Sequence, residues 1–484
     1  MIKLIYRIES DYMSKKRMLI VTSVILSVVT ISLGIVKLYQ TYALSNYIGT
    51  ETDTGIDVYI NDDSYVSIPA NGSSNVYYIL TNTNPGTVKY GVAYQTTSGV
   101  TVKVYDTSED PATGTIEEND KKYIKLHLEN KNSTNKTIEL STVLGYENGG
   151  DLVVPSGVTL VTDTYTPPTL AKDVIINLYT KASKTTVTNN DITYNTAPSV
   201  SLMNDRLGGT TTSLDGGNIR YYGANPNNYI YFNCSDYSNQ SSSTCETWRI
   251  IGVFNGKLKI IRNNSIGNLA WDQDKNDSTS MTTYDNNWST ATLQKLLNGS
   301  YYNGNGTVKY YSYSNGSDTQ TLNMNNIGLK NDATRNIIFE ATWNLGGVDT
   351  DTGRELYANQ MYEYERGTTV STGNPTTSTG KVGLMYISDY GYAVDLGKCI
   401  QAVIEYDNSS CKSNNWLIIN DDAQWTLLHN SEDSENAWYV DSAGDISFYS
   451  TNFGYIVRPV LYLDSDVAMG TGDGTSTNPY QLSV

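Results

Sequence analysis

The chain has 484 residues and a formal net charge of −17 at pH 7, from 33 Lys and Arg against 50 Asp and Glu. An excess of negative charge repels phosphate backbones, so no nucleic-acid partner is expected. The two histidines of the chain, His127 and His429, provide almost no material for a histidine zinc site or a Ser-His-Asp triad.

The N-terminal segment carries the clearest signal in the sequence. Three basic residues at 15–17 precede an uncharged apolar run over 18–36, and Lys37 ends this run. About 20 apolar residues are enough to cross the hydrocarbon core of a bilayer as a helix. The sequence therefore predicts a cytoplasmic tail over 1–17 and a single transmembrane helix over 18–38.

The basic residues also predict the orientation, because positive charge stays on the cytoplasmic side of a membrane. We expect a cell-membrane protein that crosses once, with its N-terminus inside and its bulk extracellular. A signal peptide cleaved near Ala43 is the alternative, and it gives a secreted protein. The apolar run exceeds the usual length of about 7–15 residues in a signal peptide, which favours the anchor. The true start is either Met1 or Met13.

Residues 50–163 are predicted to form an all-β domain. Short stretches of alternating apolar residues are separated by turn sequences, which is typical of an immunoglobulin-like sandwich. In one such stretch, Ile124 and Leu126 alternate with His127, so the histidine is expected to face solvent. Such a module usually serves as a stalk or spacer. A linker with a short helix is expected over 164–217.

Residues 218–484 are predicted to form an α+β domain. Strands are expected over 219–222, 229–232, 247–254 and 257–262, and Asn255-Gly256 marks a hairpin turn between the last two. Helices are expected over 289–297 and 333–343, and strands return from residue 425 onward. Two helices among early and late strands, with a long irregular insertion, are the chain order of a C-type-lectin-like fold.

The four cysteines form two close pairs in the sequence, Cys234 with Cys245 and Cys399 with Cys411. We expect two local disulfides, as is usual outside the cell. The alternative, a four-cysteine metal site, lacks any Cys-x-x-Cys unit.

A possible calcium loop follows Trp271, because Asp272, Asp274 and Asn276 alternate as oxygen ligands do in such loops. The sixth position is Asp277 where a glycine is expected, and the twelfth is Thr283 where a glutamate is expected. A solvated acidic loop is therefore the preferred interpretation. No cofactor is expected, and calcium is kept as the weaker alternative.

Tryptophans near loops or strand ends are the expected ligand-binding residues. An indole ring covers the apolar face of a sugar while neighbouring polar side chains bind its hydroxyls. Tryptophans within regular elements are expected in the core instead. The exposed candidates are Trp271, Trp288, Trp416 and Trp438.

A pair of carboxylates for glycoside hydrolysis is the remaining chemical hypothesis. Glu363, Glu365 and Asp389 are candidates, but their separation cannot be obtained from the sequence and no acid–base roles can be assigned. The chain is therefore not expected to be an enzyme.

Five sequence blocks stand out in the second half of the chain. They begin Tyr222-Gly223-Ala224-Asn225-Pro226-Asn227, Trp248-Arg249-Ile250-Ile251-Gly252, Gly380-Lys381-Val382-Gly383-Leu384, Ser388-Asp389-Tyr390-Gly391 and Val457-Arg458-Pro459-Val460. In this order, the blocks resemble a family of exported proteins of gut Firmicutes and related wall-less bacteria. That family is grouped under a domain of unknown function, similar to C-type-lectin-like and formylglycine-generating-enzyme-like folds. The resemblance covers roughly residues 218–484 and implies export and a lectin-like fold, but no reaction.

Two features of these folds do not carry over to this chain. Calcium-dependent lectins use a Glu-Pro-Asn or Gln-Pro-Asp motif, whereas this chain offers only Asn225-Pro226-Asn227. Formylglycine-generating enzymes work with active-site cysteines, whereas the four cysteines of this chain are expected to be paired. The sequence as a whole predicts a surface-anchored recognition or adhesion protein that binds a glycan or a surface protein. The alternatives are a structural surface-layer or biofilm-matrix component and an extracellular glycoside-acting enzyme.

Overall fold

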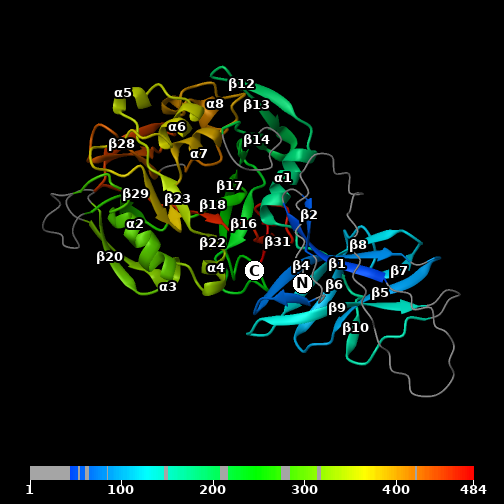
Figure 1. Ribbon diagram of the computed structural model, residues 1–484. Helices are drawn as coiled ribbons and strands as arrows, with labels where there is room; N and C mark the ends of the chain where they lie inside the picture. Colours follow the sequence, from blue (N-terminus) through cyan, green and yellow to red (C-terminus); the bar gives the residue numbers. More distant parts are fainter. Residues whose placement is uncertain are drawn as a thin grey trace, which may run out of the picture. The chain divides into compact units, whose positions relative to one another are not determined.

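The computed structural model describes residues 44–52, 55–59, 65–83, 85–145, 151–207, 216–273, 284–312, 318–419 and 422–484. It divides the chain into two compact units, residues 1–167 and residues 168–484 (Figure 1). Strands make up 40% and helices 15% of the structure. The two units are described separately below.

The first unit consists of two β-sheets. Nearly all pairs of neighbouring strands are antiparallel, and β11 pairs with β6 in parallel. The first sheet has the order β11 (Thr164–Tyr165), β6 (Val100–Tyr105), β8 (Lys121–Asn130), β4 (Gly72–Asn82), β1 (Leu44–Thr52) and β2 (Gly55–Tyr59). The second has the order β10 (Val158–Leu160), β5 (Val88–Gln95), β9 (Lys136–Gly145) and β3 (Tyr65–Ile68), and β7 (Thr113–Ile116) pairs with β5.

Strand β8 shows how the sequence builds this core. Ile124, Leu126 and Leu128 are fully buried at every second position, because successive side chains of a strand point to opposite faces. His127 lies on the other face, where its ring stacks on that of Tyr165 with centroids 3.6 Å apart. The predicted alternation is therefore present, but the histidine is half-buried by its aromatic neighbour.

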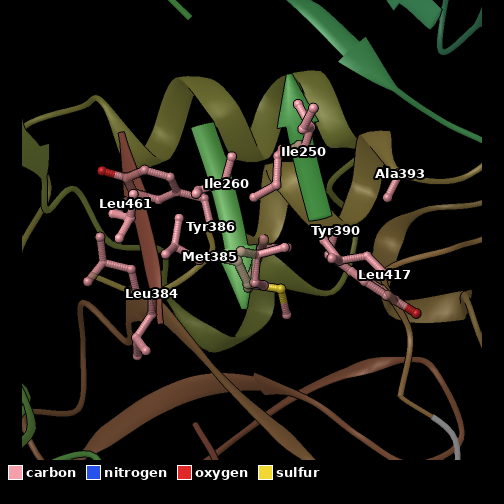
Figure 2. Packing of buried hydrophobic residues seen from close by; sticks show 14 of the residues in the cluster. Ile250, Ile260, Leu384, Met385, Tyr386, Tyr390, Ala393, Leu417 and Leu461 are labelled. Carbon is pink, nitrogen blue, oxygen red and sulfur yellow. The ribbon is translucent and has the colours of Figure 1, made fainter. Parts of the chain in front are cut away.

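The second unit is organised around a ten-stranded sheet. Its main path is β12 (Thr185–Asn189), β13 (Ile192–Ala197), β14 (Leu202–Asn204), β15 (Ile219–Tyr221), β17 (Glu246–Phe254), β18 (Lys257–Arg262), β30 (Val460–Leu463) and β22 (Ile338–Phe339). Strand β16 (Tyr229–Phe232) pairs with β17, and β25 (Val382–Gly383) pairs with β30. Side chains of this sheet, including Ile250, Ile260 and Leu461, pack in a large buried cluster with Met385 and Tyr390 (Figure 2).

A five-stranded sheet forms a second part of this unit. Its order is β19 (Asn268–Ala270), β29 (Gly454–Ile456), β26 (Gln424–His429), β27 (Asn436–Val440) and β28 (Ile446–Ser450). The remaining strands of the described residues form two-stranded pairs: β20 (Thr307–Ser312) with β21 (Asp318–Asn323), β23 (Ala341–Asn344) with β24 (Thr377–Gly380), and β31 (Ala468–Met469) with β32 (Leu482–Ser483).

The helices of the second unit are short. The longest in the described ranges, α1 (Ala171–Lys181), has 11 residues. The others are α2 (Thr292–Leu296), α3 (Met324–Ile327), α4 (Asp332–Asn336), α5 (Thr350–Gly353), α6 (Ala358–Glu365), α7 (Ile387–Tyr392) and α8 (Ser409–Lys412), with single turns at Pro198–Val200, Leu297–Tyr301 and Val403–Glu405.

The predicted fold class is wrong. We expected a transmembrane helix, an immunoglobulin-like sandwich and an α+β C-type-lectin-like domain, and the structure is mostly β-sheet. The helix expected over 18–38 lies outside the described residues. Among the residues that the structure describes, no helix is long and apolar enough to cross a membrane.

The helix predicted over 333–343 shows one physical reason for this error. Helix α4 ends at Asn336, and Ile338 and Phe339 join the ten-stranded sheet opposite Leu463 and Tyr462. β-Branched and aromatic residues gain more from pairing in a sheet than from a short helix, so tertiary contacts override the helical spacing. The segment 164–217 was expected to be a linker with a short helix. Its residues 168–207 instead form α1 and β12–β14, which belong to the second unit.

Both predicted disulfides are confirmed. Cys234 is bonded to Cys245 and Cys399 to Cys411, with 11 and 12 residues of sequence separation. No free cysteine occurs in the described part of the chain. Stable disulfides persist in oxidising compartments, which indicates an extracellular or secreted protein.

Candidate functional site

The four tryptophans expected to be exposed are all buried, so that expectation was wrong. Their indole rings belong to the core because most of their N–H groups find backbone acceptors inside it, which makes burial of a large ring favourable. Trp271 donates to the carbonyl of Thr426 at 3.0 Å, Trp416 to that of Tyr221 at 3.0 Å and Trp438 to that of Val348 at 3.3 Å, while Trp288 packs on Trp271 with ring centroids 5.0 Å apart.

A different set of rings gathers on one face of the five-stranded sheet. Strand register places Tyr439 of β27 beside Trp425 of β26, and pairs Ala437 with Tyr449 of β28, so Tyr439 and Tyr449 share a face. Tyr455 of β29 lies on this face as well, because its neighbour Ile456 pairs with Gln424 on the opposite face. We call Tyr439, Tyr449, Phe453 and Tyr455 the aromatic surface.

The rings of the aromatic surface touch one another. The centroids of Tyr439 and Tyr455 are 4.4 Å apart, and those of Tyr449 and Phe453 are 4.5 Å apart. Tyr455 joins the two pairs, with its centroid 6.4 Å from those of both Tyr449 and Phe453. These distances lie in the range of favourable aromatic contacts, so the rings hold each other in place.

Trp425 supports this surface from beneath. Its ring centroid lies 4.7 Å from that of Tyr455, and its indole N–H donates to the carbonyl of Leu269 at 2.9 Å. Trp425 is fully buried, whereas Tyr449 is 42% exposed and the other three rings are half-buried. A rigid, partly exposed group of rings over a buried base is therefore available for contact with a ligand.

Two carboxylates lie at the end of the same face. Asp441 follows β27, two residues after Tyr439. Asp445 precedes β28, two residues before Ser447, which pairs with Tyr439. Strand alternation therefore directs both carboxylates to the side of the aromatic surface. The backbone N–H of Asp441 donates to the carbonyl of Asp445 at 2.9 Å, which closes the turn.

These carboxylates influence each other and the adjacent rings. Burial, together with the hydrogen bond and negative charge of Asp441, raises the pKa of Asp445 to about 7. Burial is also the main reason for the raised pKa of Tyr455, with further contributions from Tyr439, Tyr449 and Asp441. Tyr455 therefore remains neutral at physiological pH, as apolar stacking requires.

The predicted calcium loop is only partly within the described residues, because Asp274 and Asn276 lie outside them. Asp272 is buried, and its carboxylate accepts the backbone N–H groups of Thr292 at 2.7 Å and Asp285 at 3.1 Å. It thus binds a donor at the start of α2. Across the described ranges, no group of three or more His, Cys, Asp or Glu side chains is arranged to hold a metal ion.

The proposed carboxylate pair does not meet in an open site. Glu363 is exposed, whereas Glu365 and Asp389 are buried and bound to cations. Glu365 accepts from Arg366 at 3.1 Å and from the backbone N–H of Ser388 at 2.7 Å. Asp389 lies between two cations that are described further below.

His429 is buried as well. Its Nε2 accepts the backbone N–H of Ser371 at 3.4 Å, and burial lowers the pKa of the imidazole to about 4. The neutral ring is thus part of the packing between β26 and the irregular segment that contains Ser371.

The sequence did not identify the aromatic surface because tyrosines are abundant throughout the chain. The sequence feature that points to this surface is the alternation in β27, where Trp438 is buried and Tyr439 is half-buried. In β28, Tyr449 is likewise the exposed member of the strand. That signal gains meaning only when the pairing of β27, β28 and β29 is known. No protein-family model matches this chain, and no curated protein matches it.

Proposed function

We propose that this protein is an extracellular recognition protein, without enzymatic activity, that binds a glycan through the aromatic surface. The observation that carries the proposal is the contact of Tyr439, Tyr449, Phe453 and Tyr455 over the buried Trp425, with Tyr449 42% exposed. The disulfides support an extracellular place of action.

The physical argument is the match between aromatic rings and pyranose rings. The C–H faces of a sugar are apolar, and stacking on an aromatic ring removes both from water. Sugar hydroxyls at the edge need acceptors, and the carboxylate of Asp441 lies at the end of the same face. Because the aromatic rings already hold each other, little side-chain entropy is lost on binding.

The test is binding of the oxidised protein to a glycan array, comparing the native chain with Tyr449→Ala. Loss of this ring removes the most exposed part of the stacking surface, so we expect binding to weaken about tenfold, the equivalent of about 1.4 kcal/mol. Tyr65→Ala is the matched control, because Tyr65 is 45% exposed on β3 of the first unit. It is expected to bind as the native chain does.

Two outcomes would contradict the proposal. One is an array without signal for a protein whose thermal unfolding shows that it is folded. The other is equal weakening by Tyr449→Ala and Tyr65→Ala. Concentration-dependent self-association that Tyr449→Ala abolishes would instead support the structural matrix alternative, since exposed aromatic groups also serve as contacts between copies.

A further inference from the structure

A second feature of the second unit lies apart from the aromatic surface, in the interior around Arg220 of β15. Its side chain is 1% exposed. Nε donates to Asp205 at 2.6 Å and Nη1 donates to Asp389 at 3.0 Å. Nη2 is buried and has no hydrogen-bond partner. A buried, charged donor without an acceptor is rare in folded proteins, and it commonly marks the place of a further group.

The neighbouring rings do not replace the missing acceptor. The guanidinium carbon of Arg220 lies 4.5 Å from the ring centroid of Phe254, 4.7 Å from that of Tyr392 and 5.6 Å from that of Tyr362. Stacked rings interact with the flat faces of a guanidinium, whereas its N–H groups point outward in the plane. The two N–H groups of Nη2 therefore still require an acceptor.

Another cation approaches the same tyrosine from the surface. Arg366 follows α6, and its guanidinium carbon lies 3.4 Å from the ring centroid of Tyr362. Its Nη1 donates to Glu365 at 3.1 Å and to the carbonyl of Tyr362 at 3.2 Å. The Arg366 side chain is 23% exposed, and Tyr362 is half-buried. Arg366 and Tyr362 thus form the solvent side of the region that contains Arg220.

The carboxylates of this region are already satisfied by other donors. Asp389 accepts from Lys259 and from the backbone N–H of Tyr386 at 2.9 Å in addition to Arg220. Glu365 accepts from the backbone and the hydroxyl of Ser388 besides Arg366. The buried side of the region therefore has a donor in excess, Nη2 of Arg220. A ligand that fits must bring acceptors.

We propose that Arg220, Arg366 and Tyr362 form a binding site for a carboxylate group of a ligand. A carboxylate offers acceptors only, and guanidinium groups bind it with well-defined geometry. One of its oxygens accepts from Nη2 of Arg220, and the other faces the outer edge of Arg366. Entry requires Tyr362 and Arg366 to turn outward, a motion that partly exposed side chains make readily. This site does not depend on the proposed glycan surface.

The test uses trifluoroacetate as the probe and trifluoroacetamide as its uncharged isostere, followed by ¹⁹F NMR line broadening at constant ionic strength. We expect the native protein to bind trifluoroacetate and to bind the amide at least tenfold more weakly. Arg366→Gln is expected to weaken trifluoroacetate binding at least fivefold. Arg354→Gln is the control, because Arg354 is an exposed arginine after α5, and it should bind as the native protein does.

Arg366→Lys keeps the positive charge and provides a second variant should Arg366→Gln fold poorly. It is expected to bind with intermediate strength. Equal binding of the two probes, or equal loss in the Arg354→Gln and Arg366→Gln variants, would overturn the proposal. So would a high-resolution crystal structure of protein soaked in acetate in which Nη2 of Arg220 meets only an ordered water.

Discussion

Asp389 is 2% exposed at the start of α7, and its carboxylate lies between the side chains of Arg220 and Lys259. Burial alone would raise the pKa of Asp389, but the positive charges of Lys259 and Arg220 hold it below its usual value. Burial also lowers the pKa of Lys259 to about 8. Removing one member of such a group leaves the others buried without compensation, which costs more than the pair itself contributes.

Asp389→Ala is accordingly expected to lower the free energy of unfolding by about 3–5 kcal/mol. The measurement is urea unfolding at pH 7, compared with the native protein. Asp332→Ala is the control, since Asp332 is 86% exposed in its pair with Arg335 and should change stability by less than about 1 kcal/mol. Similar effects of the two substitutions would contradict this account of Asp389.

Because His429 is buried, we expect the free energy of unfolding to depend on pH. Its folded-state pKa of about 4 is lower than the 6.5 of an ordinary histidine, so the unfolded state takes up a proton at higher pH than the folded state does. Above pH 6.5 the ring is neutral in both states, and the free energy of unfolding is not reduced by His429. As pH falls from 6.5 toward 4, protonation of the unfolded state lowers the free energy of unfolding. The loss for this buried group is on the order of 3 kcal/mol.

The measurement is the free energy of unfolding from pH 7 to pH 4 for the native protein and for His429→Gln. Asp445 titrates in the same range with the opposite sign, because its raised folded-state pKa favours the folded state as pH falls. Both proteins contain Asp445, so its contribution cancels when the free energy of unfolding of His429→Gln is subtracted from that of the native protein. This difference in free energy should decrease steadily from pH 7 to pH 4. A difference that does not depend on pH would contradict the assignment to His429.

At the scale of elements, irregular segments carry much of the second unit, and a disulfide fixes one of them. Cys399 lies after α7, and Cys411 lies within α8. Between them, Val403 and Tyr406 are buried although the segment contains only a single helical turn. A covalent closure reduces the freedom of this segment in the unfolded chain, which partly replaces the hydrogen bonds of a regular element.

Replacement of both Cys399 and Cys411 by Ser is expected to destabilise the protein by about 2–3 kcal/mol, as appropriate for a closed loop of this length. The measurement is thermal unfolding of the double variant beside the native protein under non-reducing conditions. Reductant should lower the native protein's unfolding temperature as well. A double variant as stable as the native protein would show that packing alone fixes the segment.

The predicted helices and strands are present in the structure where the local sequence pattern and the tertiary contacts favour the same conformation. The hairpin of β17 and β18 was expected from the turn sequence Asn255-Gly256, and both residues have positive φ angles in the structure. The helix expected over 289–297 is present in shortened form as α2. In contrast, the spacing of apolar residues around Ile338 predicted a helix, whereas Ile338 pairs with Leu463 in a sheet. Its conformation could therefore not be obtained from spacing alone.

At the scale of the whole molecule, the division into two units lies between Pro167 and Pro168, within the segment 164–217 that was expected to be a linker. The second unit begins there and not near residue 218, because α1 packs its apolar side, including Ile175 and Tyr179, into the main core of the second unit. A segment that looks like a linker by composition thus becomes part of a domain once its few apolar residues find a core.

The sequence by itself determined the cysteine pairs, the alternating strands of the first unit and the scarcity of histidine chemistry, because each follows from spacing or composition within a short stretch. Only the tertiary structure decided which aromatic residues are exposed and which charges are paired. Tyr439, Tyr449 and Tyr455 meet through pairing between strands, and Arg220 meets Asp389 across 169 residues of chain. Such contacts depend on where the whole chain finds its lowest free energy, which no local pattern contains.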